Sequence, residues 1–452
     1  MLFRPLIIVR RFVIGFAGLF LLSSISLARA DAPIANVQRV ISPAGIEIWY
    51  VQEVNIPVIS VSLGFRGGTV LDPPDKSGLA NFALGLLDEG AGNMSSLEFQ
   101  TAIVNKAIQL NSNASRDLIT FSLQTLTKNC DEAFKLLGMA LGEARFEAEP
   151  VERVRKQILN ILADEARNPR TIAARTWFGD IFKNHPYAHR ANGTEETIRA
   201  ITPADLKAWA AGRFARDNLI VGASGDVAPA EIARLVDSAL AGLAAHASGA
   251  PVPEVVFPEA GALQVVRMPL MQSVVIFGMP GLLRSDADFY AAYVMNYILG
   301  GGGFTSRLYE EVREKRGLAY SVYSYLAPLQ RAGLYMGGVA TRNDGVAQTL
   351  EIIRTEIARL AAEGVSAEEL LAAKQYLTGA FPLRLDSGSK VAGILVQMQF
   401  EALGIDYLDR RNGYMEGVTM ADVTRVAKRL LNPDRLRVVV VGDPEGLEPD
   451  GS

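Results

Sequence analysis

The chain has 452 residues, of which 49% are hydrophobic and 21% are charged, and its formal net charge at pH 7 is −4. This length exceeds what one ordinary hydrophobic core organises, so we expect more than one lobe. The acidic balance argues against nucleic acid and anionic membranes as partners, and the single cysteine, Cys130, excludes an internal disulfide. We expect Cys130 to be a buried small hydrophobe in a helix.

Residues 1–30 are typical of a secretory signal peptide. Arginines in the first eleven residues precede an apolar run from Phe12 to Leu27, and Ala28-Arg29-Ala30 has the pattern of a cleavage site. The run is short for a bilayer span, which favours cleavage over a retained anchor. The mature chain would carry 41 basic and 49 acidic residues, a formal charge of −8. We therefore expect a periplasmic or secreted protein without stable membrane insertion.

Hydrophobic patterning in the first half indicates strands mixed with helices. Alternating or apolar runs predict strands over Ile46–Gln52, Val58–Phe65 and Ile119–Leu126, with a helix over Gly78–Leu87. A long helix over Val151–Asn168 should end before Pro169. A strand over Asn218–Ser224 closes this half, and His246–Ala262, rich in Ala, Gly and Pro, predicts a linker. The predicted organisation is an N-terminal lobe over 31–245, a linker over 246–262, a C-terminal lobe over 263–446 and a tail over 447–452.

Two histidines, His185 and His189, have the i, i+4 spacing that could share a metal on a helix. Pro186 disfavours a regular helix there, and no carboxylate or third histidine lies nearby in the sequence. We expect a structural role for both.

The two halves repeat the same landmarks at one offset. The segment that begins Ile201-Thr202-Pro203 recurs 217 residues later, from Val418, and Gly225-Asp226 recurs at the same offset as Gly442-Asp443 after a strand over Arg435–Val441. Lys156-Gln157 recurs at an offset of 218 as Lys374-Gln375. The repeats predict duplicated α+β lobes, each a mixed, mostly antiparallel sheet packed with helices. Two such lobes joined by a linker suggest a clamshell around a cavity.

The stretch from Leu299 to Leu326 is the most informative part of the second half. Tyr309–Lys315 has the charge and length of a short exposed helix, Gly317 suits a helix end, and Leu318–Leu326 alternates like a strand. Arg313 would lie near the helix C-terminus and Tyr320 early in the strand, so both could donate hydrogen bonds into one cavity. Without the surrounding motif, an arginine near a helix C-terminus is also explained by compensation of the helix dipole, and a tyrosine early in a strand by its β propensity.

This stretch closely resembles a signature of the insulinase and pitrilysin family of metallopeptidases, which includes the mitochondrial processing peptidase subunits and their bacterial relatives. The resemblance implies that Arg313 and Tyr320 bind substrate and polarise the scissile carbonyl. It also implies a substrate-handling lid at Gly301, Gly302, Gly303 and Phe304, with a plain turn as the alternative. No Gly-Lys-Ser/Thr follows the glycines, so a nucleotide loop is disfavoured. Arg307 is expected to make a packing or salt-bridge contact within the lobe.

The resemblance also locates the helix that carries zinc in this family. The run from Gly78 to Gly85 aligns with its inverted H-x-x-E-H motif, placing Asn81 at the first histidine, Leu84 at the glutamate base and Gly85 at the second histidine. Ile161 falls at the third ligand. Catalytic zinc needs about three protein ligands, and the side chains at positions 84, 85 and 161 offer no lone pair. We expect no metal in this chain.

The function implied is that of a zinc-free, substrate-binding subunit of an exported heteromeric metallopeptidase that cleaves peptides or unfolded proteins. A homologous partner would carry H-x-x-E-H and the zinc, and this chain would be inactive alone. Substrate would extend along an edge strand, with Val58–Phe65 and Ser273–Gly278 as candidates. One alternative is a catalytically inactive peptide-binding or chaperone-like protein of the same fold. Another is an independent peptidase, disfavoured because the sequence shows no second His-Glu-His cluster or nucleophile elbow.

Overall fold

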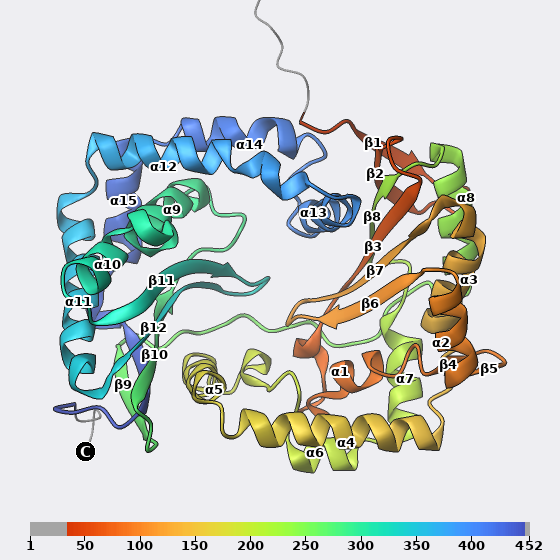
Figure 1. The fold of residues 1–452 in the computed structure, drawn as a ribbon, viewed down its shortest axis with the longest axis horizontal. Helices are drawn as coiled ribbons and strands as arrows, with labels where there is room; N and C mark the ends of the chain where they lie inside the picture. Colours follow the sequence, from red (N-terminus) through yellow and green to blue (C-terminus); the bar gives the residue numbers. More distant parts are fainter. Residues whose placement is uncertain (1–33, 448–452) are drawn as a thin grey trace, which may run out of the picture. The chain divides into compact units, whose positions relative to one another are not determined.

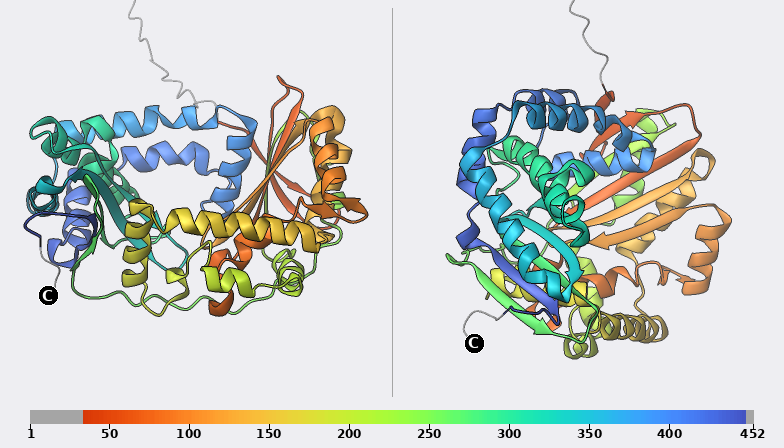
Figure 2. Two further views of the ribbon diagram at one scale, coloured as in Figure 1. Left: turned by 60° about the horizontal axis from the view of Figure 1, so that its bottom comes forward. Right: turned by 60° about the vertical axis from the view of Figure 1, so that its left-hand side comes forward.

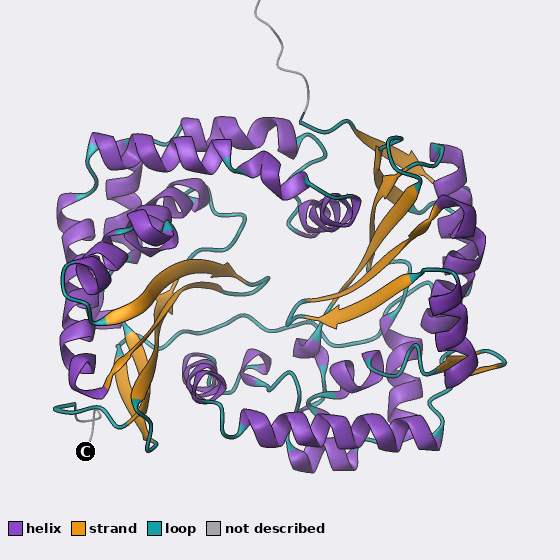
Figure 3. Cartoon of the chain, in the orientation of Figure 1, coloured by secondary structure: helices purple, strands orange, loops and turns teal. Residues whose placement is uncertain are grey.

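The computed structural model describes residues 34–447, which form one compact unit. The predicted signal peptide and all but the first residue of the predicted tail lie outside the described residues. Within 34–447 the chain has the predicted α+β architecture of two sheets packed with helices (Figure 3). No helix among these residues is long and apolar enough to cross a membrane.

The first sheet contains six strands from the N-terminal half, in the spatial order β1 (Val37–Ile41), β2 (Glu47–Gln52), β8 (Leu219–Gly225), β3 (Val58–Arg66), β7 (Leu118–Leu126) and β6 (Gln109–Ala114). The pair β2 and β8 is parallel, and the other neighbours are antiparallel. The strands predicted in this half are all present, with ends that differ by at most one residue.

The second sheet repeats this plan with five strands, in the order β11 (Ala319–Pro328), β12 (Gly333–Arg342), β10 (Gln272–Pro280), β13 (Arg437–Gly442) and β9 (Ala262–Arg267). Its single parallel pair, β13 and β9, occupies the place of β8 and β2. Thr202 and Thr419, which are 217 residues apart, each begin a helix with a capping box. The shared strand order and caps confirm the duplicated fold.

Helices cover the faces of both sheets (Figures 1 and 2). The N-terminal half contributes α1 (Leu79–Leu84), α2 (Ser96–Asn105), α3 (Cys130–Gly142), α4 (Ala148–Glu165), α5 (Pro169–Ile181), α6 (Glu195–Ala200), α7 (Pro203–Arg213) and α8 (Pro229–Leu240). The C-terminal half contributes α9 (Phe289–Asn296), α10 (Arg307–Tyr309), α11 (Val346–Glu363), α12 (Ala367–Gly379), α13 (Gly388–Phe400), α14 (Tyr407–Glu416) and α15 (Met420–Leu430). A short hairpin, β4 (Gly90–Ala91) and β5 (Met94–Ser95), precedes α2, and residues 246–261 contain neither helix nor strand.

Two predicted helices have different ends in the structure. α1 stops at Leu84, because the chain turns at Gly85. α4 stops at Glu165 because Asn168 caps the next helix, accepting a hydrogen bond from the backbone N–H of Arg170 at 2.9 Å. Cys130 lies at the start of α3, where it is buried as predicted and burial raises its pKa to about 11.

The two halves exchange one helix each. α5 packs on β10 and β13 of the second sheet, whereas α13 packs on β3 and β8 of the first (Figure 1). Glycines make room for both helices: a Cβ on Gly278 would lie 2.6 Å from the Trp177 ring, and one on Gly222 would lie 2.4 Å from the Ala392 carbonyl oxygen. The Trp177 indole N–H donates to the Arg437 carbonyl oxygen at 3.0 Å. Each sheet therefore depends on the other half for one of its faces.

The prediction that substrate would pair with Val58–Phe65 or Ser273–Gly278 is wrong. The first segment lies in β3, between β8 and β7, and the second in β10, between β12 and β13. Both strands are hydrogen-bonded on both sides, so neither can accept another strand. The edges are β1 and β6 in the first sheet and β11 and β9 in the second.

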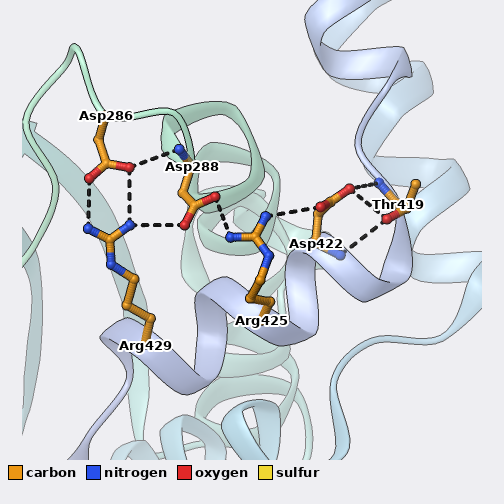
Figure 4. A network of polar contacts seen from close by, with 6 residues as sticks. All are labelled: Asp286, Asp288, Thr419, Asp422, Arg425 and Arg429. Carbon is orange, nitrogen blue, oxygen red and sulfur yellow. Dashed lines mark hydrogen bonds and ion pairs between the residues drawn. The ribbon is translucent and has the colours of Figure 1, made fainter.

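An ionic network fastens α15 to the segment that leads into α9 (Figure 4). Arg429 binds both carboxylate oxygens of Asp286, at 3.1 and 2.8 Å, and also one oxygen of Asp288 at 2.9 Å. Arg425 bridges Asp288 to Asp422, and Asp422 in turn caps α15 with Thr419. Hydrogen bonds from Arg425 and, less strongly, Arg429 lower the pKa of Asp288 against the opposing effect of burial.

Replacing Asp288 with asparagine should lower the free energy of unfolding by about 1 kcal/mol at pH 7. A carboxyl group with a lowered folded pKa stabilises the protein above its unfolded pKa of about 4, and the contribution disappears as the pH falls further. The difference from the wild type should therefore shrink below pH 4 in urea titrations. Glu195→Gln, in an exposed pair with Arg199, is the control and should change little. A pH-independent difference would contradict this assignment.

Candidate functional site

The chain around Arg313 is a short helical segment that packs against the second sheet. α10 continues into a π-helical turn over Glu310–Glu314, so the segment is helical as predicted but begins earlier. It is not simply exposed, because Leu308, Tyr309 and Val312 are buried in the core of the C-terminal half. This packing fixes the backbone that carries Arg313.

A β-bulge sets the direction of Tyr320. Gly317, with φ of 61°, ends the helical segment as predicted, and β11 then begins at Ala319. Ala319 pairs with Thr341 and Val322 with Val339, so β11 has one residue more than its partner between these pairs. Bulges bend a strand and redirect its side chains. The side chain of Tyr320 is 83% exposed at this point.

The structure brings Arg313 and Tyr320 together. The Arg313 guanidinium carbon lies 4.8 Å from the centre of the Tyr320 ring, 4.8 Å from that of Tyr309 and 5.6 Å from that of Phe304. Phe304 packs edge-on against Tyr309, with ring centres 4.9 Å apart. Cation–π contacts of this kind restrain an arginine side chain without using its N–H donors. Among the described residues, the only ion pair of Arg313 is with Glu314, whose oxygen lies 3.7 Å from Nε.

This arrangement can present donors to an incoming carbonyl group. The guanidinium side chain is 30% exposed, and the Tyr320 hydroxyl has no hydrogen-bond partner in the described chain. A guanidinium and a phenol held side by side are suited to a carbonyl oxygen or an oxyanion. The sequence predicted that these two residues lie near each other. Phe304 was predicted only as part of a lid, and Tyr309 was not predicted to take part, although it lies one helical turn before Arg313.

The glycine run lies between α9 and α10. A Cβ on Gly300 would lie 2.4 Å from the Ser324 hydroxyl of β11, so the start of the run is packed tightly. Gly301 and Gly303 are exposed, Gly302 is partly buried, and the Phe304 side chain is 76% exposed. The exposed end of the run therefore lies next to Arg313, which contacts Phe304. A lid function for this segment stays a prediction.

Arg307 makes the contact within the lobe that the sequence predicts. Its Nε and Nη2 atoms bind the two carboxylate oxygens of Glu369 at 2.6 and 2.8 Å, and Nη2 also donates to the Gly364 carbonyl oxygen at 3.0 Å. This fork is a strong form of ion pair. It ties α10 to α12.

Four positions align with the zinc-site residues. Asn81 and Leu84 lie on α1, Gly85 follows directly after it, and Ile161 lies on α4. Leu84 is buried, and Ile161 is 48% exposed on α4. The Asn81 side-chain amide donates to the Ala191 carbonyl oxygen and to Asn192 Oδ1, both at 2.9 Å. These residues do not fit a zinc ion, because the one polar side chain is already used and Gly85 has none. Among residues 34–447, no three His, Cys, Asp or Glu side chains gather as a metal site.

His185 has the structural environment that the sequence favours, whereas the buried Nδ1 atom of His189 has no partner among the described residues. The segment over Pro186–Ala188 is a single 3-10 turn. His185 is buried; its Nδ1 accepts from the Tyr187 N–H at 3.0 Å, and its Nε2 lies 3.0 Å from the Pro253 carbonyl oxygen. These contacts hold the turn against the chain between the lobes.

Comparisons with known proteins agree with the two-part organisation. The model of insulinase (peptidase family M16) matches residues 49–195, and the model of the peptidase M16 inactive domain matches residues 200–377. A non-peptidase homolog, YmxG, of Helicobacter pylori is 29% identical over 353 residues, covering 77% of this chain and 81% of that protein. An uncharacterized zinc protease of Streptomyces coelicolor is 28% identical over 426 residues, covering 90% of each.

The fold is also similar to a solved structure. The crystal structure of a peptidase M16 inactive domain from Pseudomonas fluorescens has a TM-score of 0.86 and 28% identity, covering 92% of this chain and 99% of that one. The similarity therefore extends over both sheets and the helices that cover them.

Proposed function

The chain belongs to the insulinase (peptidase M16) family, and on this premise we propose that it is the zinc-free, substrate-binding subunit of an exported two-chain zinc metallopeptidase. One observation carries the proposal: Arg313 and Tyr320 are held together with free donors, while the aligned zinc positions have no ligand set. A partner with an intact H-x-x-E-H would supply zinc and its water. This chain would supply hydrogen-bond donors for the carbonyl oxygen of the peptide.

An active site can be divided between two chains, because what matters for catalysis is where the hydrogen-bond donors point. Stabilising a developing oxyanion needs donors fixed at the right distance, whichever chain contributes them. The bulge at Tyr320 and the three aromatic rings around Arg313 restrain both side chains before substrate arrives. A protein that only binds peptides has no need of such donors at a carbonyl group.

A peptide substrate would pair with a free strand edge. β6 and β11 are edge strands of their sheets, and Figure 1 shows them on facing sides of the two lobes. Backbone hydrogen bonds along such an edge give affinity with broad sequence tolerance. These edges replace the interior strands that the sequence suggested.

Association of the two chains is the first test of the proposal. We expect the purified chain to contain no stoichiometric zinc and to co-elute in size-exclusion chromatography with a family member that carries H-x-x-E-H. The complex should contain about one zinc per pair. Failure of every such homologue from the same organism to associate would contradict the proposal and favour a peptide-binding protein that acts alone.

Replacing Tyr320 with phenylalanine should reduce the turnover number of the reconstituted pair about tenfold or more, because the phenolic donor is lost while the ring remains. Stability should not change, since the side chain is 83% exposed. Tyr323→Phe is the matched control, because Tyr323 lies on the same strand and stacks on Tyr325 at 6.2 Å. Equal turnover by both variants would remove Tyr320 from the mechanism.

A further inference from the structure

A cavity of about 250 Å³ lies on the N-terminal half between α5, the end of α4 and the loop over residues 188–192. Three arginines line it: Arg116, from the turn between β6 and β7, Arg175 from α5, and Arg190 from the loop. They are widely separated in sequence and meet only through the fold. The volume suits a group the size of one amino-acid side chain.

The positive charge of this cavity is only partly offset from within, because its wall has three arginines and one carboxylate, that of Glu165. Arg175 and Arg190 have no side-chain hydrogen bond or ion pair in the described chain. Arg116 donates from Nε to the Tyr187 carbonyl oxygen at 3.2 Å and stacks 3.8 Å from the centre of the Phe178 ring, but it has no ion pair within the described residues. Burial, and next the charge of Arg175, lower the pKa of Arg190, and the charge of Glu165 opposes this shift. Guanidinium groups that line one cavity without ion pairs favour the binding of an anion there.

The one carboxylate in the wall, that of Glu165, is already engaged. Its Oε1 accepts a hydrogen bond from the Asn192 side-chain amide at 2.6 Å, and Asn192 accepts one in turn from Asn81. These two successive hydrogen bonds hold the Glu165 side chain against the wall of the cavity. His189 also lines the cavity, and its buried Nδ1 atom has no partner among the described residues. The cavity thus has more donors than acceptors.

We propose that this arginine cavity binds a carboxylate of an extended peptide, either an acidic side chain or the C-terminus. β6 ends at Ala114, two residues before Arg116, so a peptide along the free edge of β6 would have one end at the cavity. Guanidinium forks bind carboxylates through paired hydrogen bonds, which a neutral amide cannot reproduce. The inference rests on the proposed function only in taking the occupant to be a peptide.

The test is fluorescence anisotropy with the purified chain and labelled seven-residue peptides. One series moves a single glutamate along a neutral, C-terminally amidated sequence, with glutamine at the same position for comparison. A second series compares the neutral peptide as free acid and as amide. We expect at least one carboxylate-bearing peptide to bind about tenfold tighter than its neutral counterpart, and the series in which this occurs identifies the source of the carboxylate.

Arg175→Gln and Arg190→Gln should each remove most of this difference without lowering the thermal midpoint, because neither arginine has a partner to lose. Arg170→Gln is the control: Arg170 is exposed on the same helix and does not line the cavity. A carboxylate advantage that survives both substitutions, or that is absent while neutral peptides bind, would overturn the inference and leave the proposed function standing. Absence of binding by every peptide would overturn both the inference and the substrate-binding part of the proposed function.

Discussion

Replacing Arg313 with alanine should lower the turnover number of the reconstituted pair about 100-fold, with a much smaller effect on KM. The guanidinium is the charged donor of the cluster, and loss of one oxyanion donor commonly lowers turnover by a factor of 10² to 10³. An effect on turnover more than on KM indicates an interaction made mainly in the transition state. The measurement is steady-state hydrolysis of a quenched fluorescent peptide by the variant chain mixed with its partner.

Two further variants separate chemistry from folding at this site. Arg313→Lys keeps the charge but lacks the planar fork, and should recover only part of the activity. Arg342→Ala removes an exposed arginine at the end of β12 that pairs with Asp344, and should leave turnover unchanged. Full activity of Arg313→Ala, with co-elution of the two chains intact, would exclude Arg313 from the reaction.

Replacing Trp177 with alanine should lower the free energy of unfolding by about 3–5 kcal/mol. The indole is fully buried where α5 crosses the second sheet, and its N–H is bonded to the Arg437 carbonyl oxygen. Removing it leaves a cavity against Gly278 and an unpaired carbonyl group. The measurement is equilibrium unfolding in urea, followed by circular dichroism.

Trp177→Phe is the matched variant, because it retains most of the ring and loses the hydrogen bond. It should lose about 1–2 kcal/mol. Because each half supplies a helix to the other, we expect one cooperative transition in the wild type. A loss below about 1 kcal/mol in Trp177→Ala would show that the exchanged helix contributes little to holding the halves together.

Helices and strands could be predicted from the sequence where they depend on the pattern of neighbouring residues. The alternation in Val58–Phe65 and the helix end at Gly317 are properties of a few neighbouring residues, and both are present in the structure. The order of strands in a sheet is not local. β8 joins the first sheet from more than 90 residues beyond β7 and separates β2 from β3, and this made a predicted edge strand an interior one. The exchange of α5 and α13 has the same origin.

The same difference between local and non-local features applies to the candidate site. Arg313 and Tyr320 are seven residues apart within one recognisable motif, so their proximity could be predicted. The bulge that exposes Tyr320 depends on pairing with β12, which the sequence of β11 alone does not specify. Arg116, Arg175 and Arg190 have no regular spacing, and the turn, helix and loop that carry them meet only in the folded chain.

Hydrolysis of a mixed peptide library tests the divided active site most directly. The chain, its H-x-x-E-H partner and the mixture are assayed at equal concentrations, with the zinc content of each sample recorded. We expect no cleavage by this chain alone and substantial cleavage by the mixture, with activity following one zinc per pair. Cleavage by the partner alone at the rate of the mixture, or inactivity of the mixture with tight peptide binding by this chain, would contradict the assignment.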